Sequence, residues 1–130
     1  MLPLVIALFL VAAVFGLTMA IFIFKNRFPP FGLIVAHGTF ALPALGMAIL
    51  SAGLPGTPSI VVYGVLVVML AAVGGVFLIS FQFRDEKQPK IVVVAHALAA
   101  VSGVSCLLIG LLQMSRFLPP AQWLAGAAGH

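Results

Sequence analysis

Residues 2–24 read LPLVIALFLVAAVFGLTMAIFIF, an apolar run without a single charged side chain. At a rise of ~1.5 Å per residue, a helix of this length spans the ~30 Å hydrocarbon core of a bilayer. The run stops at Lys25, Asn26 and Arg27, which are residues suited to a membrane–water interface. It is too long for the apolar region of a signal peptide and follows no basic segment. We therefore expect a retained first membrane helix.

Three more apolar runs follow, separated by short polar or proline-containing turns. The membrane spans that we expect cover about residues 2–24, 31–53, 59–83 and 91–114. The sequence thus predicts an all-α integral membrane four-helix bundle, with a single transmembrane domain over residues 1–130. A tail at 117–130 holds Pro119-Pro120 and Trp123, which suits a short segment at the membrane surface.

The composition supports the membrane class. Hydrophobic residues make up 64% of the chain and charged residues 6%, with Asp85 and Glu86 as the only acids. A soluble domain of this size has too little interior to hide so much apolar surface. The net charge of +4 therefore reports membrane orientation and not a nucleic-acid partner.

Basic residues also predict the orientation. The two loops that end near Pro30 and Lys90 carry five of the six Lys and Arg residues, whereas the turn at 54–58 carries none. The positive-inside rule places these loops in the cytoplasm and both termini outside. Compactness and loop charge suggest a bacterial inner membrane.

The two halves of the chain resemble each other at an offset of 59 residues. The matched pairs are Gly16 and Gly75, Phe22 and Phe81, Lys25 and Arg84, Pro30 and Pro89, Ala36 and Ala95, and His37 and His96. Each half, about 1–55 and 60–116, holds two spans, so the repeat is parallel. We expect two pseudo-symmetric helix hairpins related by an approximate two-fold along the membrane normal.

His37 and His96 are the leading candidates for a functional site. Ionisable side chains inside hydrocarbon are costly and are functional candidates by default. Both lie seven residues past a proline, roughly 10 Å below the starts of two parallel helices. Facing imidazoles at equal depth fit the axial ligands of one haem iron. Another metal, a proton-linked role and a structural hydrogen bond remain as alternatives for this pair.

Two further sets of residues would serve such a haem. Small residues near the two histidines would leave room for a macrocycle, although close helix packing explains them equally well; they are Ala41, Ala44, Ala100 and Gly103. Cations at the loops would face the haem propionates, although membrane orientation alone also accounts for them; they are Lys25, Arg27, Arg84, Lys87 and Lys90. For the second ring nitrogen, we expect carbonyls one turn earlier on the same helix or hydroxyls as partners.

With four spans and this histidine pair, the chain resembles the small four-helix b-type membrane cytochromes, including the cytochrome b561-like proteins. The resemblance implies electron transfer through non-covalent haem b, in exchange with quinone or a small redox partner. Members with two haems need two histidine pairs, and this chain has one, so the expectation is one haem per chain. The single cysteine, Cys106, lies in no Cys-x-x-Cys-His segment, which excludes covalent c-type attachment.

The leading hypothesis is therefore a haem b-binding membrane protein that transfers electrons. The alternatives are a small proton-linked transporter and an accessory or assembly subunit of a larger membrane complex, and a homodimer is compatible with each. No nucleophile–base–acid set can be drawn, so we assign no catalytic residue and no hydrolytic site. If the protein is an enzyme, we expect a membrane oxidoreductase acting with quinone or a redox protein.

Overall fold

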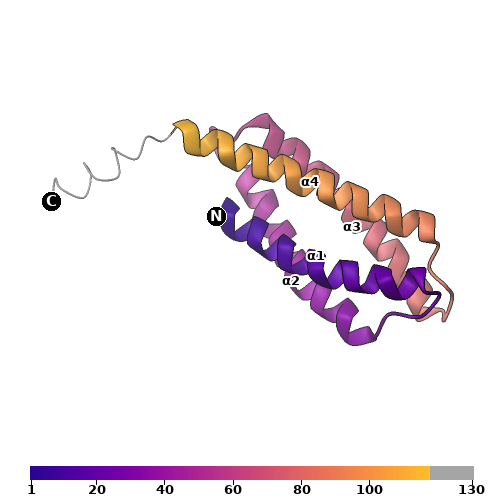
Figure 1. Cartoon of the computed structure of the whole chain (residues 1–130). Coiled ribbons are helices and arrows are strands. Elements are labelled where there is room, and N and C mark those ends of the chain that lie inside the picture. Colours follow the sequence, from indigo (N-terminus) through magenta and orange to yellow (C-terminus); the bar gives the residue numbers. More distant parts are fainter. Residues whose placement is uncertain (118–130) are drawn as a thin grey trace.

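The computed structural model describes residues 1–117, and the predicted surface segment at Pro119-Pro120 and Trp123 lies outside them. It consists of four helices, listed in chain order: α1 (Leu2–Phe24), α2 (Phe31–Ala52), α3 (Ser59–Phe83) and α4 (Lys90–Phe117). Figure 1 shows them packed side by side as one elongated bundle. Each is long and apolar enough to cross a membrane. The prediction of four membrane-spanning helices in an all-α bundle is confirmed at this level.

The helix bounds follow the apolar runs closely. α1 and α3 match the predicted spans, α2 ends one residue earlier than expected, and α4 runs on to Phe117 instead of stopping near 114. Pro43 lies inside α2 without ending it. Because backbone polar groups cannot be left unpaired in hydrocarbon, a long apolar run has little choice but to form a continuous helix.

α1 and α3 end in the same way. The Arg27 N–H donates to the Phe22 carbonyl and the Glu86 N–H to the Phe81 carbonyl, both at 2.9 Å. The turn that closes each helix needs a residue with positive φ, and Asn26 (φ 56°) and Asp85 (φ 54°) fill that position. Asparagine and aspartate tolerate this left-handed conformation better than most residues. Each helix is thereby followed by a tight polar loop.

The helices pack mainly as two hairpins. α1 lies along α2 and α3 along α4, while α1–α4 and α2–α3 contacts join the hairpins into a bundle. α2 and α4 are therefore diagonal partners. They start at the same end of the bundle, which is the end that carries the two charged loops.

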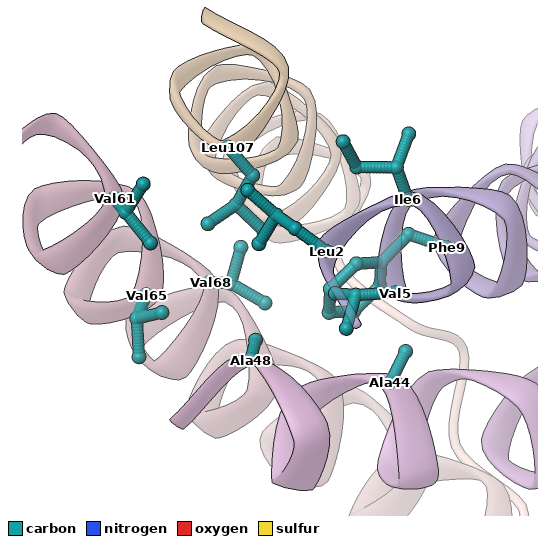
Figure 2. Close-up of a cluster of buried hydrophobic side chains, with 10 residues drawn as sticks. All are labelled: Leu2, Val5, Ile6, Phe9, Ala44, Ala48, Val61, Val65, Val68 and Leu107. Carbon is teal, nitrogen blue, oxygen red and sulfur yellow. The ribbon is translucent and has the colours of Figure 1, made fainter. Parts of the chain in front are cut away.

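The hydrophobic core occupies the opposite end. Figure 2 shows the buried cluster, which consists of Leu2, Val5, Ile6, Phe9, Ala44, Ala48, Val61, Val65, Val68 and Leu107. These residues come from the first turns of α1 and α3 and the last turns of α2 and α4. The half of the bundle nearer the charged loops contributes no member of this cluster.

The outer surface is apolar on every helix. Leu17, Leu42, Leu70 and Leu98, one from each helix, are 67%, 67%, 67% and 64% exposed. Apolar surface of this extent is unfavourable in water and favourable against lipid tails. The bundle is therefore an integral membrane protein.

Candidate functional site

His37 on α2 and His96 on α4 lie next to each other across the bundle. Their ring centroids are 6.3 Å apart, and the ring planes are inclined at 67°. The two residues occupy the same turn of diagonally opposed helices, seven residues past Pro30 and Pro89. The structure therefore brings together the two histidines that the sequence singled out.

Each imidazole is fixed by a backbone carbonyl of the neighbouring helix. His37 Nδ1 lies 2.8 Å from the Ala12 carbonyl oxygen, and His96 Nδ1 lies 2.7 Å from that of Ala71. A carbonyl oxygen only accepts, so Nδ1 carries the proton and donates in both contacts. In the neutral imidazole, Nε2 then retains its lone pair and is free to bind a metal.

The expected partners for these ring nitrogens were wrong. Carbonyls of the same helix or nearby hydroxyls were predicted, but the acceptors come from the facing helix of each hairpin. The hydroxyls of Thr18, Thr39 and Ser80 instead donate to carbonyls of their own helices. A hydroxyl inside an apolar helix finds its own backbone nearest, which leaves it outside the histidine site.

Two glycines complete the surroundings of the histidines. A Cβ placed on Gly16 would lie 3.1 Å from His37 Cε1, and one on Gly75 would lie 3.2 Å from His96 Cε1. These glycines let each imidazole lie against the neighbouring helix and reach its carbonyl. The sequence reasoning did not assign Ala12, Gly16, Ala71 or Gly75 to the site. The signal that could have found them is the 59-residue offset, which pairs Ala12 with Ala71 and Gly16 with Gly75.

His37 and His96 are less buried than the residues of the core cluster. Val5, Val61 and Leu107 have no exposed surface, whereas His37 and His96 are only half-buried. The membrane interior would offer no water to these imidazoles. His37 and His96 keep part of their surface exposed, unlike the core residues.

The four small residues predicted beside a macrocycle divide into two pairs. Ala41 and Ala100 are half-buried near the histidines. Ala44 is fully buried in the core cluster, and a Cβ on Gly103 would lie 2.5 Å from Val68 Cγ2. For Ala44 and Gly103, the structure therefore favours helix packing, the second of the two explanations that the sequence left open.

The five loop cations all lie exposed at the histidine end of the bundle. Arg84 is engaged locally, since its guanidinium lies 3.5 Å from Glu86 and 4.6 Å from the centroid of the Phe81 ring. Arg27 lies 5.8 Å from the centroid of the Phe22 ring. Arg27, Lys87 and Lys90 also border one small pocket between the loops, which Lys25 and Arg84 do not.

The protein donors at the site are two imidazoles. Within residues 1–117, no cluster of three or more His, Cys, Asp and Glu side chains could hold a metal ion by itself. A metal bound at His37 and His96 would therefore take its remaining ligands from a group other than the described protein residues. Comparison of the chain with known protein families, with curated proteins and with solved structures found no significant match.

Proposed function

We propose that the protein binds one non-covalent haem b between α2 and α4 and transfers electrons through it. His37 and His96 would be the two axial ligands of the iron. The observation that carries this proposal is the separation of the two rings across the bundle, with the Nδ1 of each ring already hydrogen-bonded elsewhere.

The ring separation fits a shared metal ion. A metal–imidazole bond is about 2.1 Å and a ring centre lies about 1.1 Å behind its nitrogen, so two imidazoles on opposite sides of one ion would have centroids roughly 6.4 Å apart. The observed distance is 6.3 Å. A hydrogen bond between two neutral imidazoles would instead need both a donor and an acceptor nitrogen, but each Nδ1 proton is donated to a carbonyl and both Nε2 atoms are acceptors.

The donor set favours a haem over a metal ion alone. Two imidazoles leave most coordination positions of a transition metal open, and the four nitrogens of a macrocycle fill them. The Nδ1–carbonyl bonds would fix ring orientation and raise ligand basicity, as partners of metal-bound histidines commonly do. When bound, the haem supplies reversible one-electron iron chemistry, and two axial histidines leave no position for a substrate.

The protein contributes the charge balance and the exclusion of water. Cations at the adjacent loop end would neutralise the haem propionates; the available ones are Lys25, Arg27, Arg84, Lys87 and Lys90. The apolar outer surface keeps the site within lipid, where a quinone is a suitable electron partner. A redox protein at the membrane surface is the other class of partner.

The two hairpins would form a parallel repeat around this haem. Both Nδ1–carbonyl contacts join residues 25 positions apart, and both loops close through matching residues at the 59-residue offset. A two-fold between the hairpins would present two equivalent imidazoles to one iron. We place the charged loops in the cytoplasm of a bacterial cell and the N-terminus outside, because of the loop cations.

The test is the visible spectrum of the full chain, expressed with ample haem and purified in detergent. We expect a sharp, low-spin b-type reduced-minus-oxidised spectrum with one haem per chain. The spectrum should be absent in His37→Ala and in His96→Ala and unchanged in His130→Ala, which removes the third histidine of the chain. A colourless wild-type protein would refute the proposal and favour an accessory or proton-linked role.

Loss of the spectrum must be separated from loss of the fold. Circular dichroism and size-exclusion profiles of each variant should match those of the wild type. A His96→Gly variant offers a second check, because added imidazole should restore the spectrum if His96 acts as a ligand. Failure of imidazole to restore it in a folded variant would argue against axial ligation.

A further inference from the structure

The two charged loops enclose a small pocket at the histidine end of the bundle. Its volume is about 20 Å³. The lining residues come from the end of α1, the loop after it, the second charged loop and the start of α4; they are Ile23, Asn26, Arg27, Phe28, Lys87, Gln88 and Lys90. Residues about sixty positions apart in the sequence therefore form one concave surface.

Hydrogen bonds hold the two loops against each other. Gln88 Nε2 donates to Gln82 Oε1 at 3.1 Å, and Gln82 Nε2 lies 3.4 Å from the Pro29 carbonyl oxygen that accepts from it. Gln88 is only 8% exposed, although it lies in a polar loop. The relay connects the Gln88 side chain to the backbone of the first loop and so holds the two loops side by side.

The charge of the pocket is not compensated by its lining. Arg27, Lys87 and Lys90 border it, while neither acid of the chain does. Glu86 pairs with Arg84 at 3.5 Å, outside the pocket lining. Lys90 is also the first residue of α4, where the helix dipole adds partial positive charge. A concave site of this charge attracts an anion.

The position of the pocket identifies the anion. α1 ends at Phe24 and α4 begins at Lys90, so the loops lie at the level where a membrane presents its headgroups. Lipid phosphates are concentrated there, and basic pockets between membrane helices bind anionic lipids. The pocket has room for about one water-sized group, which suits a single phosphate oxygen of a headgroup that lies over it. Phe28, also in the lining, offers an apolar surface to the lipid beside the phosphate.

We propose that this pocket binds the headgroup phosphate of an anionic phospholipid through Arg27, Lys87 and Lys90. The relay and the cations are in place in the protein without haem; Arg27, Lys87 and Lys90 would serve the lipid phosphate and leave Lys25 and Arg84 for the haem propionates. A bound lipid would hold the loop end of the bundle, which contributes no residue to the core cluster.

Native mass spectrometry of the detergent-purified full chain tests this site. Titration with dioleoyl phosphatidylglycerol should load one lipid at concentrations at which dioleoyl phosphatidylcholine does not bind. The Lys87→Gln/Lys90→Gln variant should bind phosphatidylglycerol about tenfold to thirtyfold more weakly, because each surface cation contributes ~1 kcal/mol to attraction of anionic lipid.

The matched control is Lys25→Gln/Arg84→Gln. It removes two charges from the same loops but none from the pocket lining, so its affinity should stay within about threefold of the wild type. Equal losses in the two double variants, or equal binding of phosphatidylcholine, would overturn the proposal. If millimolar inorganic phosphate displaced the lipid, the pocket would be a site for free phosphate, and the proposal of a phospholipid ligand would be overturned. The visible spectrum is recorded in parallel, so this proposal and the haem proposal fail separately.

Discussion

At the scale of single residues, a glycine on the neighbouring helix gives each imidazole the space that it occupies. His37 lies against Gly16 and reaches the Ala12 carbonyl, and His96 lies against Gly75 and reaches that of Ala71. A buried imidazole that lost this acceptor would leave an unpaired N–H in hydrocarbon. The glycines therefore let each Nδ1–H reach its carbonyl acceptor.

A Gly16→Ala substitution should displace the His37 ring. The new Cβ would lie 3.1 Å from Cε1 and 3.2 Å from Nδ1, so the ring must move by a few tenths of an ångström away from the Ala12 carbonyl. We expect a loss of roughly 1–3 kcal/mol in stability relative to a glycine-to-alanine change elsewhere, as for other overpacked sites. Unfolding in mixed detergent measures this loss.

Gly38→Ala is the matched control for that experiment. A Cβ there meets nothing within 4 Å, so the variant gains helix propensity without a clash. Both glycines lie inside helices, so each variant gains the same helix propensity from the alanine. The difference in stability between the two variants then reports the contact with the His37 ring. Equal stability of Gly16→Ala and Gly38→Ala would show that the imidazole is not held against Gly16.

At the scale of helices, the two hairpins use different residues for close packing. Ala44 and Ala48 of α2 are buried in the core cluster, whereas α3 and α4 meet through Gly64 and Gly103. A Cβ on Gly64 would lie 2.9 Å from the Gly103 carbonyl oxygen, which places the two backbones in near contact. Small residues allow this approach in membranes, where packing and not the hydrophobic effect holds helices together.

Gly103→Ala should therefore destabilise the α3–α4 hairpin. The added Cβ would lie 2.9 Å from the Gly64 carbonyl oxygen and 3.0 Å from the Val68 backbone nitrogen, and backbone atoms cannot rotate away. We expect a cost of about 2 kcal/mol, within the range for overpacked cores. Thermal unfolding of the purified protein, followed by circular dichroism, measures it.

Gly46→Ala serves as the control for helix packing. It changes a helical glycine whose Cβ position is open, so the variant should be as stable as the wild type or slightly more so. If Gly103→Ala were also neutral, α3 and α4 would have to lie farther apart than the structure shows.

At the scale of the whole molecule, the bundle is divided along its axis. The end with the 53–58 turn holds the hydrophobic core, and the end with the charged loops holds the histidines, the cations and the relay between loops. The residues of the core cluster and the candidate functional residues thus lie at opposite ends of the bundle. The half that holds the histidines contributes no residue to the core cluster, so a ligand bound there would leave that cluster in place.

The loop charge predicts how this axis lies in the membrane. In a Cys106→Ala background, a Leu54→Cys variant should react with an impermeant maleimide in intact bacterial spheroplasts. A Glu86→Cys variant should react only after lysis if the loops follow the positive-inside rule, which keeps basic loops in the cytoplasm. Both residues are exposed, so accessibility within the protein is not limiting. Labelling of the Glu86→Cys variant in intact cells would reverse the proposed orientation.

The sequence by itself determined the class of fold and the level of the histidines. In hydrocarbon every backbone polar group must be paired within the segment, so long apolar runs become helices whatever their neighbours do. Loop charges and prolines then mark the helix ends, and the residue count from Pro30 to His37 equals that from Pro89 to His96. Depth along a helix follows from such counting alone, at ~1.5 Å per residue.

Only the tertiary structure decided which atoms surround each imidazole. The rotation and spacing of neighbouring helices are set by small residues and side-chain interlocking, which an apolar pattern on all faces does not reveal. For this reason the contacts of the Ala12 and Ala71 carbonyls and of the glycines beside the rings were not predicted. The relay through Gln82 and Gln88 is of the same kind, because it joins loops that only folding brings together.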